Sequence, residues 1–210
     1  MHVLIISDLH LGDYSTYGYV ANSEYEFIKL SYKLKEVCTN NNISEIWVLG
    51  DIVQYPLIKP KEMILIKKFF NNLSNIKIRG ILGNHDQAIY FNQKEDNILD
   101  RLLKICNVEI LNNNILNIDN KKIYFVSYNN KIKNIKADVL LTHCTMSDLD
   151  SKSFDNFSRI ILGHEHKYFK FKNVISCDSI LRHSKEETNN ITSGLIMNID
   201  KTIDITRIKI

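Results

Sequence analysis

Near its start the chain reads Val3-Leu4-Ile5-Ile6-Ser7-Asp8-Leu9-His10, a short apolar run that ends in a carboxylate and an imidazole. A β-branched run of this length predicts a buried strand over residues 2–7. Asp8 and His10 stand two positions apart, so on an extended chain their side chains would lie on the same side. An apolar run followed by side chains of this kind recurs four more times along the chain.

The four later runs end in Asp, Asn or His. Asp51 follows residues 46–50, Asn84, His85 and Asp86 follow 78–83, His143 follows 139–142, and His164 and His166 follow 160–163. Oxygen and nitrogen donors of this kind suit a hard or borderline divalent metal ion. Because the carboxyl ends of parallel strands meet in one crevice of an α/β sheet, these ends together predict a common site.

Strands and helices alternate in the first half of the chain. Apolar residues at helical spacing predict helices over residues 22–42, 61–73 and about 95–105, with strands over 45–49 and 76–82 between them. This rhythm favours parallel strands covered by helices.

The second half is rich in short apolar segments separated by polar turns. Strands are expected near 108–111, 115–118, 122–128, 138–142, 159–163, 168–171, 173–176, 193–199 and 203–209. Asp119-Asn120 and Asp200-Lys201 are typical of hairpin turns. The expected fold class is therefore α/β, with two sheets packed face to face, helices on the outer faces and one domain over residues 1–210.

Composition gives broad limits on the function. The 210 residues are 44% hydrophobic and 24% charged, as in ordinary globular proteins, and the formal net charge of +3 tolerates a polyanionic partner without requiring one. The four cysteines form no Cys-x-x-Cys pair, so we expect free thiols, and Cys144 is interpreted as a small structural neighbour of His143. No signal peptide or apolar stretch of about 20 residues is evident, so we expect a cytoplasmic protein without a membrane partner.

The donors are too many for one ion. The candidate metal ligands number seven: Asp8, His10, Asp51, Asn84, His143, His164 and His166. They suit two ions that share a carboxylate, and mixed ligation of this kind favours Mn first, or Fe or Zn, over Ca or Mg. Two ions about 3.5–4 Å apart can hold a phosphoryl group and generate a metal-bound hydroxide. His85 is placed to protonate a leaving oxygen, with Asp86 expected to orient its ring.

These residues resemble a known family. Asp8-Leu9-His10, Gly50-Asp51, Gly83-Asn84-His85-Asp86, His143 and Gly163-His164-Glu165-His166 are similar, in order and rough spacing, to five motifs of the calcineurin-like metallophosphoesterases. The resemblance runs from residue 3 to about residue 170. It implies a four-layer α-β-β-α sandwich of two mixed sheets flanked by helices.

The resemblance also implies a role for each donor. One metal would be held by Asp8, His10, Asp51 and His166, and the other by Asp51, Asn84, His143 and His164. Asp51 would bridge the two ions, and His85 would contact the scissile phosphate.

The subfamily is less clearly marked. Gly50-Asp51 lacks the Asp-Arg-Gly of the protein Ser/Thr phosphatases, the third motif ends in Asp86, and Arg79 and Arg101 offer no obvious phosphate clamp. Residues 6–12, 162–167 and 176–199 are similar to the DNA double-strand-break repair nucleases, without their C-terminal capping domain. Gln54, Cys177 and the short stretch between His85 and His143 depart from that pattern.

Three functional hypotheses follow. The first is a phosphodiesterase or exonuclease-like enzyme that acts on DNA or another phosphodiester. The second is a small phosphomonoesterase or nucleotide phosphatase on the same fold, and the third is a binding module without metals. A homodimer is compatible with the sequence, and an ATPase partner stays open.

Several other residues have two interpretations. Tyr14, Tyr17 and Tyr19 would stack on a base or pack on their own loop. Structural roles are favoured for His2 and His183, and roles in a loop or behind the metal ligands for Asp13 and Asp178. A solvated face is favoured over phosphate contact for the alternating residues Lys167, Lys170 and Lys172.

Overall fold

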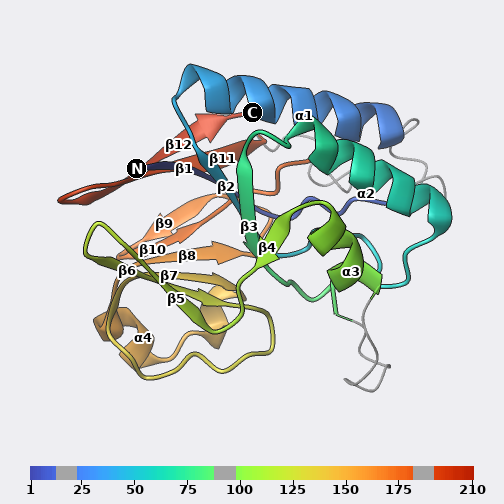
Figure 1. Ribbon diagram of the computed structural model, residues 1–210. Coiled ribbons are helices and arrows are strands. Elements are labelled where there is room, and N and C mark those ends of the chain that lie inside the picture. Colours follow the sequence, from blue (N-terminus) through green and yellow to red (C-terminus); the bar gives the residue numbers. More distant parts are fainter. Residues whose placement is uncertain (13–22, 88–97, 182–191) are drawn as a thin grey trace.

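Two six-stranded sheets lie face to face in the computed structural model, which describes residues 1–12, 23–87, 98–181 and 192–210 (Figure 1). The first sheet has the order β12-β11-β1-β2-β3-β4 and the second the order β5-β6-β7-β8-β10-β9. The helices α1 and α2 cover the outer face of the first sheet, and α4 lies beyond the second (Figure 1). The expected four-layer sandwich of two mixed sheets is confirmed.

The strands follow the predicted apolar runs closely. The first sheet contains β1 (His2–Ile6), β2 (Glu45–Leu49), β3 (Lys77–Ile81), β4 (Val108–Ile110), β11 (Ser193–Ile199) and β12 (Ile203–Lys209). The second contains β5 (Asn114–Ile118), β6 (Lys121–Val126), β7 (Ala137–His143), β8 (Phe157–Gly163), β9 (Phe169–Phe171) and β10 (Val174–Ser176). Asp119 and Asn120 both have positive φ, 48° and 64°, as the hairpin turn between β5 and β6 requires.

The helices are α1 (Ser23–Asn40), α2 (Pro60–Asn72), α3 (Ile98–Ile105) and α4 (Ser151–Asn156), with a 3-10 turn η1 (Met146–Asp148). Neither α4 nor η1 had been predicted, because segments of six and three residues are too short to show a helical period. Asp150 caps α4 by accepting a hydrogen bond from the Ser153 N–H at 2.8 Å. None of the helices in the described ranges is long and apolar enough to cross a membrane.

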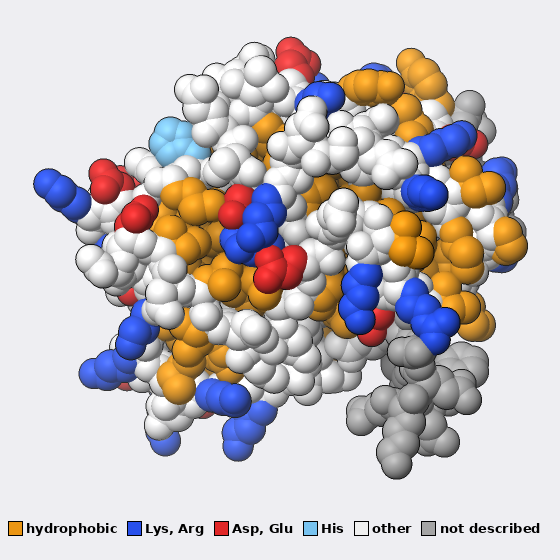
Figure 2. All heavy atoms as spheres, in the orientation of Figure 1, with side chains coloured by type: hydrophobic (Ala, Val, Ile, Leu, Met, Phe, Trp, Pro, Cys, Tyr) orange, Lys and Arg blue, Asp and Glu red, His pale blue; other side chains and the backbone are white. Residues whose placement is uncertain are grey.

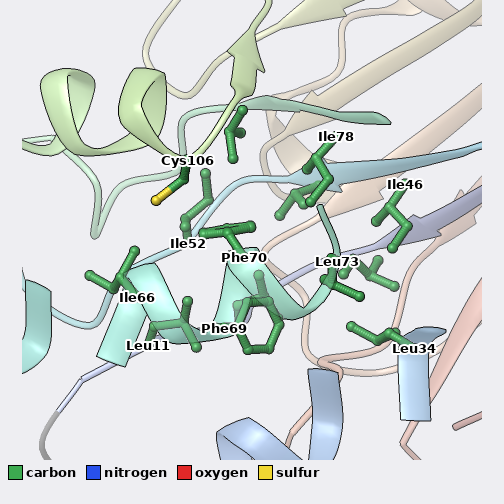
Figure 3. Packing of buried hydrophobic residues seen from close by; sticks show 14 of the residues in the cluster. Leu11, Leu34, Ile46, Ile52, Ile66, Phe69, Phe70, Leu73, Ile78 and Cys106 are labelled. Carbon is green, nitrogen blue, oxygen red and sulfur yellow. The ribbon is translucent and has the colours of Figure 1, made fainter. Parts of the chain in front are cut away.

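Both faces of the central strands are buried. Along β1, Leu4 and Ile6 pack toward the helices, whereas Val3 and Ile5 pack toward the second sheet. Figure 3 shows the helix-side layer, where Phe69 and Phe70 of α2 approach the strands. This explains why the strands appear in the sequence as continuous apolar runs rather than alternating ones.

The two sheets meet through a second apolar layer. Trp47 of β2 contacts Phe125 of β6 edge to face, with ring centroids 5.1 Å apart. The strands β1, β2, β3 and β4 run parallel, as do β6, β7, β8 and β10. Their carboxyl ends therefore gather at one edge of each sheet, where the predicted donors lie.

A polar group also lies between the sheets. The buried carboxylate of Glu45 accepts a hydrogen bond from Trp47 Nε1 at 2.8 Å and pairs with the Arg79 guanidinium. Arg79 Nε also donates to Glu109 at 2.9 Å, and its side chain is only 12% exposed. The cation therefore compensates a carboxylate that is removed from water.

We expect Arg79→Leu to lower the free energy of unfolding by roughly 3 kcal/mol, because it leaves the Glu45 carboxylate buried without its cation. Urea unfolding measures the change. Lys77→Ala is the matched control: its pair with Glu109 is half exposed, so the loss should be below about 1 kcal/mol. Equal losses in the two variants would contradict this account of the intersheet layer.

Candidate metal centre

The structure brings the predicted donors to one place from both sheets. Asp8, Asp51 and Asn84 follow β1, β2 and β3, while His143 ends β7 and His164 and His166 follow β8. Three groups have ligand atoms within 4.8 Å of one another: Asp8–His10–His166, His10–Asp51–His85 and Asp51–His143–His164. Asn84 joins the last group, since its Oδ1 lies 2.9 Å from His164 Nδ1 and 3.0 Å from His143 Nε2.

Asp51 lies in the middle of this constellation. Its Oδ2 is 3.6 Å from His10 Nε2 on one side and 3.4 Å from His143 Nε2 on the other. At the far end of the first side, His166 Nε2 is 3.3 Å from Asp8 Oδ1 and 3.4 Å from His10 Nε2. A single carboxylate is thus shared by two groups of donors.

The backbone at the donors is left-handed. Asp8, His10, Asp51, His164 and His166 have φ values of 56°, 45°, 51°, 80° and 50°. Each such residue costs roughly 1 kcal/mol or more, so the surrounding contacts must enforce the conformation. Backbone hydrogen bonds contribute: Asp8 N donates to Gly50 O at 3.2 Å, and His10 N to Asp51 O at 2.8 Å.

This geometry corrects one argument made from the sequence. The proximity of Asp8 and His10 does not come from alternation along a strand. Strand β1 ends at Ile6, and both residues adopt the left-handed backbone conformation instead. The turns aim both side chains inward. A short loop with these turns brings both donors to the same site.

Glycines permit the close approach of the loops that carry the donors, both between the sheets and within the first sheet. A Cβ on Gly163 would lie 2.2 Å from Leu49 O and 2.4 Å from Ser7 Oγ, both on the opposite sheet's side. A Cβ on Gly83 would lie 2.1 Å from Asp51 Oδ1. Neither separation is possible for a side chain, so only glycine allows these loops to meet.

Backbone carbonyls fix the orientation of two histidine rings. His143 Nδ1 lies 2.7 Å from Leu49 O, and His85 Nδ1 lies 2.8 Å from Gln54 O. A carbonyl oxygen only accepts, so each Nδ1 carries a proton and each Nε2 is the ring nitrogen that faces the site. At His143, Nε2 faces the oxygens of Asn84 and Asp51, and a cation between them would displace the proton from Nε2 and bind its lone pair.

The electrostatics of the cluster also favour bound cations. Burial alone would raise the pKa of Asp8, but the hydrogen bond with His166 and the nearby histidines hold it well below its usual range. Burial alone would lower the pKa of His143, but the hydrogen bond with Asp51 and the charges of Asp8 and Asp51 raise it to about 9. A divalent ion would replace the proton that these carboxylates attract.

Asp86 takes a different position from the one expected. It is fully buried, and its oxygens accept hydrogen bonds from Gly83 N at 2.8 Å and Val53 N at 3.0 Å. Burial and the charge of Asp51 raise its pKa to about 6, although the backbone N–H groups oppose the rise. The ring of His85 is held by Gln54 instead, so Asp86 shapes the turn after β3 rather than orienting His85.

Asp178 ties the end of the site to the first sheet. It accepts hydrogen bonds from Tyr168 N at 2.5 Å and from Arg207 Nε at 3.1 Å, and it also contacts Ser193. Ser179 Oγ then donates to Asp8 O at 3.2 Å. The segment after β10 therefore braces the loop that carries Asp8.

The remaining candidates are exposed, have a structural interpretation or lie outside the described ranges. His2 is exposed and bonded to Asn41 O, and Lys167, Lys170 and Lys172 are exposed. Burial raises the pKa of the Cys144 thiol to about 12, which supports its structural interpretation. Asp13, Tyr14, Tyr17, Tyr19 and His183 lie outside the described residues.

Two contacts to the site had no sequence signal. The Tyr128 ring stacks on His164, with centroids 6.2 Å apart and planes 28° apart. Glu165 accepts a hydrogen bond from Met146 N at 2.9 Å, which ties the loop after β8 to the loop after β7. An aromatic residue and a carboxylate in polar loops are too common to be noticed without the fold.

The fold resembles those of solved phosphoesterases. Comparison with curated proteins finds no significant match. Among solved structures, a novel archaeal phosphodiesterase superposes with a TM-score of 0.57 at 16% identity, covering 100% of both chains. YfcE, a phosphoesterase from E. coli, superposes with a TM-score of 0.52 at 11% identity, also over 100% of both chains. At these identities the likeness is one of fold.

A family model gives the stronger result. The model described as calcineurin-like phosphoesterase matches residues 1–168, a span that contains every donor of the cluster. With most of its length matched and its five strand-end motifs gathered at one edge of the two sheets, the chain belongs to the calcineurin-like phosphoesterase family.

Proposed function

We propose that the chain is a two-metal phosphodiesterase, with Mn²⁺ as its preferred ion and Fe or Zn as alternatives. Asp8, His10, Asp51 and His166 would hold one ion, and Asp51, Asn84, His143 and His164 the other. The observation that carries the proposal is the shared position of Asp51 between two groups of donors. When bound, two such ions orient a phosphoryl group, neutralise its charge and make water a better nucleophile.

His85 is the proposed general acid. Its ring lies edge-on to His10, with centroids 4.6 Å apart, and its backbone N–H donates to Asp51 Oδ1 at 2.9 Å. Because Nδ1 is bound to Gln54 O, Nε2 is the ring atom left to exchange a proton with substrate. A positioned histidine can protonate the oxygen of a departing alcohol at neutral pH.

The surroundings support a diester over a monoester. A monoester carries more negative charge, and arginine pairs are a common way to bind it. Arg79 is engaged with Glu45 and Glu109 between the sheets, and Arg207 with Asp178. Of the arginines in the described ranges, these two are therefore not available to clamp a phosphate.

DNA and nucleotides are both possible sources of such a diester. On the face shown in Figure 2 the Lys and Arg side chains are scattered among white and orange areas, without one continuous basic surface. The formal net charge is only +3. These features favour a small or single-stranded substrate over a duplex held by many phosphate contacts.

Activity should depend on bound metal ions. Treatment with EDTA should abolish hydrolysis of bis-p-nitrophenyl phosphate, and added Mn²⁺ should restore it. Asp51→Asn should lower kcat/KM by at least about 100-fold, since removal of a mere outer partner of a metal ligand costs about 10- to 100-fold. Full activity of the EDTA-treated protein would refute metal dependence.

His85 should matter most for a substrate whose leaving group needs a proton. Loss of a general acid should cost roughly 10²- to 10⁴-fold where the leaving group needs a proton. We therefore expect His85→Ala to slow hydrolysis of dithymidine monophosphate, whose leaving group is an alkoxide, far more than hydrolysis of bis-p-nitrophenyl phosphate, whose p-nitrophenolate leaves unaided. His2→Ala, at an exposed histidine bonded to Asn41 O, is the control. Equal losses on both substrates would exclude the proton-donor role.

A further inference from the structure

A pocket adjoins the candidate metal centre on its His143 side. It has a volume of about 420 Å³ and is lined by the turn after β6, which includes Tyr128, Asn130 and Lys131, and by Cys144 and Asp148 after β7. His143 forms part of its wall. Its size is at the lower end of the range for pockets that bind small molecules, about 300–1,000 Å³.

We propose that this pocket binds a single nucleoside, as the group that stays attached to phosphorus when the diester is hydrolysed. The inference rests on the proposed phosphodiesterase function and adds the substrate class. The substrate is then a nucleoside phosphate ester rather than a duplex.

The position of the pocket assigns it to the retained group. His85 lies against both His10 and Asp51, so the leaving oxygen is protonated on the His10 side of Asp51. The pocket lies at the opposite end, beside His143, with Asp51 between the two ends. A diester that spans the cluster would place its leaving group near His85 and its other ester group in the pocket.

The lining suits a planar ring with polar edges. Tyr128 lines the pocket, and because one face of its ring stacks on His164, the other face is the one that a base would stack on, a contact that is effective with any base. Backbone hydrogen bonds hold the turn that carries Tyr128: Tyr128 N donates to Leu82 O at 2.8 Å, and Asn130 N donates to Ser127 O at 3.2 Å. The side chain is thus presented by a fixed turn, and Asn130 and Lys131 beside it supply polar groups for the edge of a base.

Two acids on the pocket argue against a polynucleotide. Asp148 and Asp150 line it and are exposed. Each carboxylate accepts a hydrogen bond from a backbone N–H of its own loop, Asp148 from Thr145 N and Asp150 from Ser153 N, both at 2.8 Å. A second phosphate in the pocket would meet these carboxylates, and like charges in contact are strongly unfavourable. A neutral nucleoside meets no such penalty.

The test compares two esters with the same leaving group. Hydrolysis of thymidine 5′-(p-nitrophenyl phosphate) joins a water oxygen to phosphorus, breaks the bond to p-nitrophenolate and leaves thymidine 5′-monophosphate. Methyl p-nitrophenyl phosphate undergoes the same step without a nucleoside. We expect kcat/KM to be at least about tenfold higher for the thymidine ester. The ratio of the two values cancels any change in metal loading.

Pocket variants should change that ratio. Tyr128→Leu should reduce it at least about fivefold, whereas Tyr128→Phe, which keeps the aromatic face, should preserve it. Lys131→Ala, at an exposed position, should reduce it about threefold or more. Lys133→Ala is the matched control, since Lys133 belongs to the same loop and is exposed but does not line the pocket.

Cys144 provides a readout independent of turnover. It is half-buried in the pocket wall, whereas Cys38, Cys106 and Cys177 are buried. Because burial raises the pKa of the Cys144 thiol to about 12, its labelling by N-ethylmaleimide is slow at neutral pH and is followed at alkaline pH. Thymidine 5′-monophosphate should slow this labelling at least about fivefold in the Mn²⁺-loaded protein, and inorganic phosphate at the same concentration should not.

The outcomes separate the two proposals. If the wild-type protein hydrolyses neither ester, the phosphodiesterase function itself fails. If it hydrolyses both at similar kcat/KM, with no effect of Tyr128→Leu or Lys131→Ala on the ratio and no protection of Cys144, the nucleoside pocket is wrong while the phosphodiesterase function stands.

Discussion

The shortest contact between the first sheet's Leu49 and the candidate site of the second sheet is a buried hydrogen bond, in which the Nδ1–H of His143 donates to the carbonyl oxygen of Leu49 at 2.7 Å. These residues end β7 and β2, so the bond crosses from one sheet to the other where their carboxyl ends meet. It sets the separation of the sheets at this edge and determines which ring nitrogen faces inward. Gly163 is required beside it, because any side chain there would collide with the same carbonyl.

The rest of the cluster depends on that separation. With the sheets held close, Asp51 from the first sheet reaches the histidines of the second, and His164 N can donate to Asp8 at 3.2 Å. The left-handed backbone at five of the donors is unfavourable by itself, and the fixed loops compensate it. An arrangement that concentrates carboxylates and lone pairs at such cost is typical of a functional site rather than a structural one.

The sequence predicted the strands and the gathering of the donors because both follow from simple patterns. Apolar runs such as Val3–Ile6 form strands, and donors at the ends of parallel strands must share an edge. It could not predict that β11 pairs with β1 and so returns the chain to the first sheet, because pairing between distant strands leaves no local mark. The carbonyls of Leu49 and Gln54 that orient His143 and His85 were also hidden, since every residue has one. For the same reason Asp86 was expected to orient His85, whereas it accepts hydrogen bonds from the backbone N–H groups of Val53 and Gly83.

The central claim is that Asp51 bridges two metal ions. Anomalous scattering from crystals of the Mn²⁺-loaded protein tests it most directly. The account predicts two peaks about 3.5–4 Å apart, one on each side of the Asp51 carboxylate. A single peak, or two peaks that do not share Asp51, would contradict it.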